Sequence, residues 1–310
     1  MLQAQAISVE VGGRLLVDAA SFTVMARDKV GIVGRNGAGK TSLFKVLGGA
    51  NEPKSGKVVR KGGFGYLPQD PKIDSALDGR SCVTHVLSGR GIDDEITRIE
   101  KLRIAMEENP DERNVSRYSE AEEAFRTTGG YASESEARAM AAGLGIPDAR
   151  LDQPISTLSG GERRRVELAR ILFAGSDVLC LDEPTNHLDV DAKAWLLGFL
   201  RQYKGALLVI SHDLELLDES ITRVLHLDRA TEHDVGEIVE YRGTYSQYQR
   251  ARAEDEARLA KKAVLQAKEI DRLQTVVDRF GAKATKAAMG AEYPDEAVDK
   301  TAFTPGSAAT

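Results

Sequence analysis

Cysteine is scarce in this chain of 310 residues, which contains only Cys82 and Cys180, far apart in the sequence. Neither a disulfide-stapled secreted scaffold nor a cysteine-based zinc site is therefore expected. Long apolar runs are missing too: none approaches the ~20 residues of a membrane-spanning helix, so we expect no membrane insertion. Residues 1–13 lack a basic segment followed by an apolar core, so no secretory leader is expected either. These absences predict a cytoplasmic protein.

A strong excess of one charge is also absent. The 42 lysines and arginines against 48 aspartates and glutamates give a net charge of −6. This excludes a globally basic, nucleic-acid-coating protein but leaves room for a local basic patch. Hydrophobic residues make up 42% of the chain, which is enough for a buried core and unlike a disordered protein.

Strand patterns occur at both ends of the folded region. Residues 6–11 alternate apolar and polar side chains, and Val30–Val33 form a short apolar run that leads into a glycine-rich loop. Later in the chain, Val178–Leu181 and Ala206–Ile210 are uninterrupted apolar runs, which are typical of strands buried on both faces of a parallel sheet. The sequence therefore predicts an α/β core with a mostly parallel sheet.

Other segments differ from this core in composition. From residue 73 to 150 charged residues dominate, and apolar ones recur at helical spacing. After residue 245 a seam of mostly apolar residues follows a heptad spacing, as in a coiled-coil helix: Leu259, Ala263, Gln266, Ile270, Leu273, Val277 and Phe280. The predicted organisation is an α/β core (1–72 and 151–245), an inserted helical subdomain (73–150), a long charged linker helix (246–289) and a disordered tail (290–310).

The clearest chemical signal is the glycine-rich loop Gly34–Thr41, with the sequence GRNGAGKT. Glycines allow backbone amides to close around phosphate oxygens, and the N-terminus of the following helix attracts anions. Lys40 would neutralise the β- and γ-phosphates, and the Thr41 hydroxyl would hold Mg²⁺. An ordinary strand–helix turn is the alternative, but the match to G-x-x-x-x-G-K-[ST] between a strand and a helix favours a phosphate loop.

Two more places carry functional groups. Asp182 and Glu183 end a predicted strand, where the first could reach a metal ion and the second could orient or deprotonate a water molecule. Alone, an acidic strand end is usually only a turn. Ser159 precedes a predicted helix: it is either a simple N-cap or, with the amides of Gly160 and Gly161, a second anion-binding site.

Together these motifs resemble the ATP-binding cassette (ABC) ATPases over roughly residues 2–245. The resemblance implies a P-loop NTPase fold that binds ATP and Mg²⁺. The implied ATP-binding residues are Gly34, Arg35, Asn36, Gly37, Ala38, Gly39, Lys40, Thr41 and Ser42. The implied Mg²⁺ ligands are Thr41, Gln69 and Asp182, and the implied catalytic residues are Glu183, His212 and Gln69. The resemblance also identifies a signature motif that serves a nucleotide on a partner cassette, and a D-loop aspartate: Ser159, Gly160, Gly161, Glu162 and Asp189.

One feature of the family pattern is not found. The family usually stacks an aromatic side chain on adenine from a position shortly before a glycine turn. Val11 precedes the turn at Gly12 and Gly13 here, and Phe22 is the only aromatic residue ahead of the phosphate loop. The base selectivity of the site is left open by the sequence.

Two segments indicate to which class of ABC ATPases the chain is similar. Glu183–Asp189 has the sequence EPTNHLD, which is similar to the ABC-F class, whose members act on ribosomes; transport subunits more often carry SALD at its end. Gly243–Tyr248, before the charged helix, resembles the start of the ABC-F linker that reaches toward tRNA. From Arg250 to Lys286, ten basic and six acidic residues give +4, which suits an RNA surface, although a solvated coiled-coil face would have the same composition. The resemblance implies the ribosome and tRNA as partners.

ABC-F proteins carry two cassettes, whereas this sequence contains one and about half of a linker. We therefore expect a truncated or frame-shifted product that needs a second cassette, either another copy of itself or the missing half. Such a chain would bind Mg-ATP but hydrolyse it slowly unless it associates head to tail. The alternatives are the ATP-binding subunit of an ABC membrane transporter and an inert remnant. The sequence does not distinguish between translational throttling, ribosome rescue and antibiotic protection as the role.

Overall fold

The structure is a computed structural model that describes residues 1–71, 79–229, 231 and 234–290, with the backbone alone over 276–290. Its contacts divide the chain into two compact units, Met1–Gln249 and Arg250–Thr310. The predicted core segments and the predicted helical subdomain both belong to the first unit.

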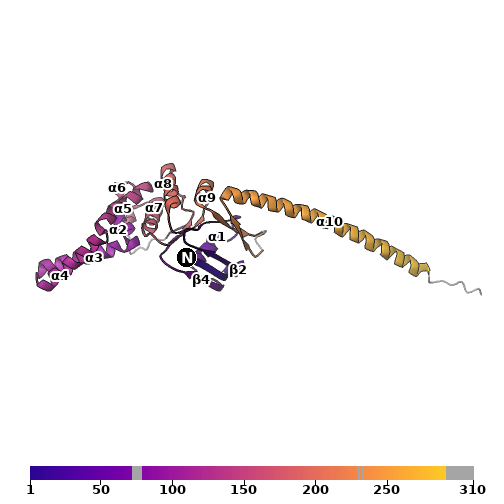
Figure 1. Ribbon diagram of the computed structural model, residues 1–310, viewed down its shortest axis with the longest axis horizontal. Coiled ribbons are helices and arrows are strands. Elements are labelled where there is room, and N and C mark those ends of the chain that lie inside the picture. Colours follow the sequence, from indigo (N-terminus) through magenta and orange to yellow (C-terminus); the bar gives the residue numbers. More distant parts are fainter. Residues whose placement is uncertain (72–78, 230, 232–233, 291–310) are drawn as a thin grey trace, which may run out of the picture. The chain divides into compact units, whose positions relative to one another are not determined.

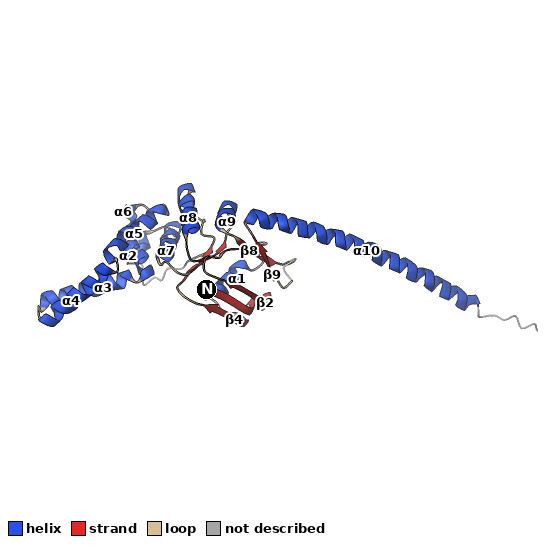
Figure 2. Cartoon of the chain, in the orientation of Figure 1, coloured by secondary structure: helices blue, strands red, loops and turns tan. Residues whose placement is uncertain are grey.

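A six-stranded sheet forms the centre of the first unit (Figure 2). Its strands are β3 (Lys29–Gly34), β5 (Phe64–Leu67), β6 (Val178–Asp182), β7 (Ala206–Ile210), β8 (Arg223–Asp228) and β9 (Glu237–Arg242). They lie in the order β5–β6–β7–β3–β8–β9, and every neighbouring pair is parallel except β8 and β9. The predicted α/β class with a mostly parallel sheet is confirmed.

The central strands are buried on both faces. Because successive side chains of a strand point to opposite faces, Leu179 and Leu181 of β6 pack into one apolar core, and Val178 and Cys180 pack into another. A strand covered on both sides has no solvent-facing positions. This is why β6 and β7 are uninterrupted apolar runs rather than alternating ones.

One face of the sheet is covered by helix α1 (Lys40–Gly48) and by a second, antiparallel sheet. The antiparallel sheet consists of β1 (Leu2–Val11), β2 (Arg14–Val24) and β4 (Ser55–Arg60), in the order β2–β1–β4. Gly12 and Gly13, with φ of 58° and 79°, make the turn from β1 to β2. Glycine adopts this left-handed backbone without steric cost.

A group of helices lies on the other side of the sheet, and its outer members extend away from the strands (Figure 1). They are α2 (Cys82–Leu87), α3 (Ile92–Glu108), α4 (Glu112–Thr127), α5 (Gly130–Gly143), α6 (Asp148–Leu151), α7 (Gly160–Phe173), α8 (Val190–Gln202) and α9 (Leu214–Ser220), with short 3₁₀ turns at Ser88–Arg90 and Ile155–Thr157. The helical character predicted for 73–150 is seen from Cys82 onward. The limits proposed for that subdomain stay predictions, and residues 72–78 lie outside the described part of the chain.

Helix α10 (Tyr245–Gly290) covers the predicted linker helix. Its first turn belongs to the first unit, where the main-chain N–H of Ser246 donates to Asp218 at 2.7 Å and Tyr248 is buried. In the second unit the apolar side chains described on α10 are exposed, with Leu259 at 61% and Leu265 at 66%. The predicted disordered tail lies outside the described residues except for Gly290, which ends α10.

Among the described residues, no helix combines the length and the apolar composition needed to cross a bilayer.

Candidate functional site

The glycine-rich loop connects β3 to α1, as predicted. Gly37 and Gly39 have φ of 77° and 104°, so they adopt a backbone that is strained for other residues. Gly39 is the N-cap of α1 and offers no side chain to the first-turn amides, so these remain available to an anion. The Nζ atom of Lys40 donates to the carbonyl oxygens of Gly34 at 2.8 Å and Arg35 at 3.1 Å. The Lys40 side chain therefore folds back so that its ammonium contacts the carbonyl groups of the loop.

Two carboxylates stand at the end of β6. Asp182 is fully buried, and within the described residues neither of its carboxylate oxygens has a hydrogen bond of regular geometry. Burial raises the pKa of Asp182 to about 6, and the negative charge of Glu183 adds to this effect, while Thr41, Arg164 and Lys40 oppose it. A buried carboxylate without hydrogen-bond partners is the arrangement that a bound cation would satisfy.

Burial also lowers the pKa of Lys40, while the charges of Glu183 and Asp182 raise it. Lys40 therefore interacts electrostatically with both carboxylates of the site, Asp182 and Glu183. Since a triphosphate carries several negative charges, it would favour the charged form of Lys40, and a cation would favour the ionised form of Asp182.

Glu183 has an unusual backbone. Its φ is 51°, a left-handed value that costs a residue with a side chain about 1–3 kcal/mol. Its main-chain N–H donates to the carbonyl of Ile210 at 2.8 Å, and its Oε2 accepts the main-chain N–H of His212 at 3.1 Å. Oε1 lies 3.5 Å from Nε2 of His212, whose side chain is 68% exposed. Strain of this kind is concentrated at functional sites.

These groups line one cavity of about 590 Å³. Ten of the predicted site residues lie on its wall: Asn36, Gly37, Gly39, Lys40, Thr41, Ser42, Gln69, Asp182, Glu183 and His212. Gly34, Arg35 and Ala38 belong to the loop but do not line the cavity. The geometry thus brings together the predicted phosphate, metal and water-activating groups, although their chemical roles stay predictions.

Six further lining residues were not predicted: Val11, Arg14, Leu16, Asn186, Ile210 and Arg229. Arg229 is buried; its Nε donates to the carbonyl of Asp234 at 2.7 Å, and its Nη1 lies 3.4 Å from the carbonyl of Gly37. The only available signal was its place directly after β8, which neighbours β3. None of the described lining residues is aromatic.

The predicted signature residues lie outside this cavity. Ser159 is the N-cap of α7, where its Oγ accepts the main-chain N–H of Glu162 at 3.3 Å and donates to that residue's Oε2 at 2.7 Å. Asp189 caps α8 and accepts the main-chain N–H of Ala192 at 2.9 Å. The capping interpretation of Ser159 is confirmed. Both Ser159 and Gly160 are exposed and are open to a molecule outside this chain.

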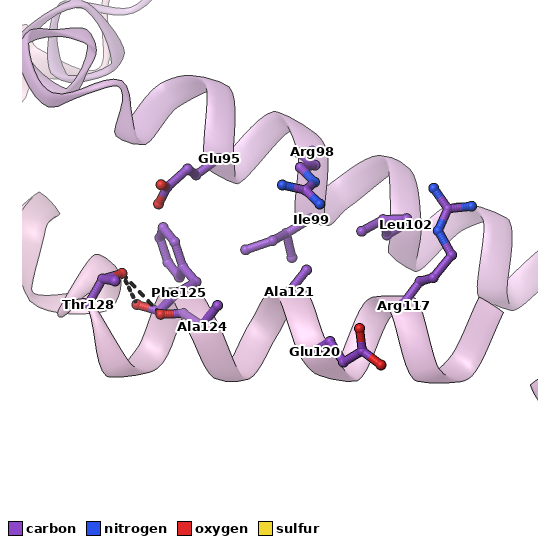
Figure 3. Close-up of a pocket in the computed structure, with 10 residues that line it drawn as sticks. All are labelled: Glu95, Arg98, Ile99, Leu102, Arg117, Glu120, Ala121, Ala124, Phe125 and Thr128. Atoms are coloured by element: carbon purple, nitrogen blue, oxygen red, sulfur yellow. Dashed lines mark hydrogen bonds between the residues drawn. The ribbon is translucent and has the colours of Figure 1, made fainter. Parts of the chain in front are cut away.

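A second hollow lies between α3 and α4 and has a volume of about 240 Å³ (Figure 3). Ile99, Leu102 and Phe125 contribute apolar surface there, next to side chains of both charges. It has no glycine-rich loop. Nowhere in the described residues do three or more histidine, cysteine, aspartate or glutamate side chains form a group able to hold a metal.

Comparison with known proteins identifies the family. A model described as "ABC transporter" matches residues 17–186, and a second model with the same description matches residues 231–292. The chain belongs to the ATP-binding cassette family. The relatives described below are consistent with the ABC-F class, and the predicted resemblance to the ABC family is confirmed.

Three relatives illustrate this placement. The chain is 37% identical to the probable ATP-binding protein YheS of Haemophilus influenzae, over 91% of this chain and 42% of that protein. It is 33% identical to the putative ATP-binding protein YdiF of Bacillus subtilis, over 92% and 44%. It is 35% identical to the energy-dependent translational throttle protein EttA of Haemophilus influenzae, over 71% and 38%. The chain thus spans less than half the length of the curated relatives it matches.

Solved structures agree with the fold. The ATP-binding subunit of an ABC transporter superposes with a TM-score of 0.57 at 18% identity, over 82% of this chain and 93% of that one. A dimeric post-hydrolysis state of an ATP-binding cassette with ADP and Pi superposes with a TM-score of 0.54, also at 18% identity, over 78% and 100%. The predicted P-loop cassette fold is confirmed.

Proposed function

We propose that this cassette binds Mg-ATP in the cavity between α1 and the end of β6 and hydrolyses it. The observation that carries the proposal is the meeting of Lys40, Asp182 and Glu183 on one cavity wall. The amides of the glycine-rich loop and Lys40 would bind the phosphates. Glu183, held against His212, would orient or deprotonate the attacking water.

The metal site is part of this proposal. Mg²⁺ usually binds proteins through one or two carboxylates and completes its shell with phosphate oxygens and water. The unsatisfied oxygens of Asp182, together with Thr41 and Gln69 on the same wall, fit that requirement. When bound, Mg²⁺ would bridge phosphate oxygens and neutralise charge that develops on them.

The proposed site is completed by a second cassette. The signature residues Ser159–Glu162 are on this chain but do not line its own cavity, so they would serve a nucleotide bound to a partner. The partner would be another copy of this chain or a cassette from a longer product of the same kind. Turnover per chain is then expected to be slow at low protein concentration and to rise as chains associate.

The test of ATP hydrolysis combines concentration and a single substitution. Phosphate release is measured over a hundredfold range of protein concentration, for the wild type and for Glu183→Gln. The expected result is turnover per chain that rises with concentration, and a variant that retains bound ATP as a stable dimer on a sizing column. Turnover that is fast and independent of concentration would contradict the composite site, and unchanged ATP retention by Glu183→Gln would favour an inert remnant.

We further propose that the cassette acts in the cytoplasm on the ribosome and tRNA, through α10. Two observations support this role: α10 between Arg250 and Lys286 has a net charge of +4, and the relative EttA is named as a translational throttle. Lysines facing RNA phosphates bind with a strong salt dependence because counterions are released.

Co-sedimentation with ribosomes at several salt concentrations tests this role. Replacing the exposed Lys261, Lys262 and Lys268 with Gln should weaken sedimentation and reduce the slope of log affinity against log salt by up to about 3. The matched control replaces three exposed lysines of the first unit: Lys57, Lys61 and Lys204. Equal effects of the two triple variants would argue against an RNA contact by α10. Recovery with a membrane permease instead of ribosomes would favour a transporter subunit.

A further inference from the structure

A buried arginine connects the signature helix to the carboxylates. Arg164, on α7, is only 6% exposed. Its Nη2 donates to the carbonyl oxygen of Asp182 and to that of Glu183, both at 2.8 Å. Its Nε has no hydrogen-bond partner among the described residues. Burying a guanidinium with an unsatisfied donor is costly, so an arginine here is not explained by packing alone.

The peptide that Arg164 holds is the strained one. Glu183 has a left-handed backbone, and its carbonyl accepts a second hydrogen bond, at 3.2 Å, from the main-chain N–H of Asn186. In an extended backbone this carbonyl would point elsewhere, and both bonds would break. The two bonds therefore favour the conformation in which the Glu183 carboxylate reaches the main-chain N–H of His212.

We propose that Arg164 is a positioning residue for hydrolysis: it keeps the Glu183 peptide left-handed, so that the carboxylate is aimed at the water beside His212. Arg164 does not line the cavity, so its proposed effect on the reaction is indirect, through the Glu183 peptide whose carbonyl it holds. The inference rests on the ATP hydrolysis proposed above. Since Arg164 stands on the second turn of the helix that begins with the signature residues, it also joins that helix directly to the water-activating residue.

The principal variant is Arg164→Lys. It keeps the positive charge, but its side chain is one bond shorter, so its ammonium cannot reach both carbonyl oxygens. The matched control is Arg163→Gln on the same helix. Arg163 also donates to two carbonyl oxygens, those of Leu158 at 3.2 Å and Ser156 at 2.9 Å, and it does not touch the end of β6.

Turnover and ATP affinity are measured first. Arg164→Lys should lower turnover at saturating Mg-ATP at least 30-fold and change the dissociation constant of Mg-ATP less than threefold. In the Glu183→Gln background the same substitution should have no further effect on residual turnover, because it acts through Glu183. Independent, multiplicative losses, or a parallel loss of affinity, would overturn the proposal. The Arg163→Gln control should leave the affinity unchanged.

Amide hydrogen exchange supplies a readout that needs no nucleotide. Loss of the carboxylate contact should accelerate exchange of the His212 N–H at least fivefold in Arg164→Lys and not in Arg163→Gln, with exchange in β7 unchanged. Unchanged exchange at His212 would overturn the inference even if the wild type proves unable to bind ATP. That last result would contradict the proposed function instead, so the two failures are distinguishable.

Unfolding supplies a measurement for the case in which Arg164→Lys is unstable. Glycine adopts the left-handed backbone without help, so Arg164→Lys should lower the denaturant midpoint less in a Glu183→Gly background than in the wild type. A variant that folds only in the Glu183→Gly background would give the same support. Equal losses in both backgrounds, or failure to fold in both, would overturn the proposal.

Discussion

Glu183 and His212 are in contact through two pairs of atoms. Oε2 of Glu183 accepts the main-chain N–H of His212 at 3.1 Å, and Oε1 lies 3.5 Å from the imidazole Nε2. The contact arises from the sheet, since β6 and β7 are parallel neighbours with Asp182 opposite Ile210, and both residues follow the ends of these strands. The carboxylate is therefore held by a main-chain group that truncation of the His212 side chain leaves in place.

For this reason, His212→Ala should lower the turnover of the protein while leaving its stability nearly unchanged. The main-chain contact to Glu183 survives, and the lost side chain is mostly exposed, so the free energy of unfolding should change by no more than about 0.5 kcal/mol. Turnover should nevertheless fall at least tenfold, because the family resemblance implies a catalytic role for the imidazole of His212. Denaturant unfolding checks the predicted stability, and phosphate release checks the predicted loss of turnover. A stable variant with full turnover would remove His212 from the mechanism.

Lys40→Met should reduce the affinity for Mg-ATP at least 100-fold, which is about 2.7 kcal/mol. The substitution removes the ammonium from the phosphate loop and leaves a side chain of similar length. Lys45→Met is the matched control, because Lys45 is exposed in the last turn of the same helix. Isothermal calorimetry should detect no change for the control. Undiminished affinity of Lys40→Met would contradict the whole site.

Asp182→Asn should make the protein more stable near neutral pH. The pKa of Asp182 is about 6 in the native protein against 3.8 normally, so the native state binds more protons between about pH 4 and 6. The contribution of this group to stability is therefore lost as the pH rises through that window. Asparagine does not ionise, and the variant should exceed the wild type in unfolding midpoint at pH 7.5 but not at pH 4.

A measurement of ATP affinity and a control variant complete the test of Asp182→Asn. Asp182→Asn should also lose the gain in ATP affinity that Mg²⁺ provides, as measured by calorimetry with and without the metal. Asp177→Asn is the control: Asp177 accepts the main-chain N–H of Gly63 at 2.8 Å and shows no comparable burial. That variant should lose stability at pH 7.5. An Asp182→Asn variant destabilised equally at both pH values would show that burial does not govern this carboxylate.

The sequence predicted those parts of the site that are formed by residues close together along the chain. Gly34–Thr41 lies between a strand and a helix in the chain itself, and the two-sided burial of β6 is visible as an apolar run that ends at Asp182. Parallel strands then bring their carboxyl ends to one edge, so that Asp182 and His212 meet without further information. His212 itself was predicted only from the family resemblance, and the parallel sheet brings it to the edge where Asp182 lies.

The remaining parts depend on packing between distant segments. Val11 and Arg14 reach the cavity because β1 and β2 form a separate antiparallel sheet over α1, which no local pattern encodes. Arg164 stands between two other arginines, and such a charge run is typical of a solvated helix face. Only the packing of α7 against the end of β6 distinguishes it from its neighbours.

Ser159→Ala should distinguish the helix-capping role of Ser159 from its proposed role in a partner's catalytic site. Loss of an N-cap serine costs about 1 kcal/mol of stability, and Ser81→Ala on α2 is a matched cap, since Ser81 accepts the main-chain N–H of Thr84 at 3.2 Å. Both variants should lose similar stability. Only Ser159→Ala should also lose turnover, with the affinity of the single chain for ATP unchanged. If both serines affect turnover equally, the effect is structural and Ser159 has no role in a partner's site.

The last prediction concerns the nucleotide base. Beyond the phosphate loop the cavity is lined by Val11, Leu16 and Arg14, and no described lining residue is phenylalanine, tyrosine or tryptophan. Apolar contact and guanidinium stacking hold any purine, whereas strong selectivity requires hydrogen bonds that read the edge of the base. The dissociation constants of ATP and GTP should therefore differ less than about tenfold, and Arg14→Ala should weaken both by a similar factor, about tenfold. Arg126→Ala, at an exposed site on α4, is the control. A preference for ATP above 100-fold that survives Arg14→Ala would mean that another group reads the base edge.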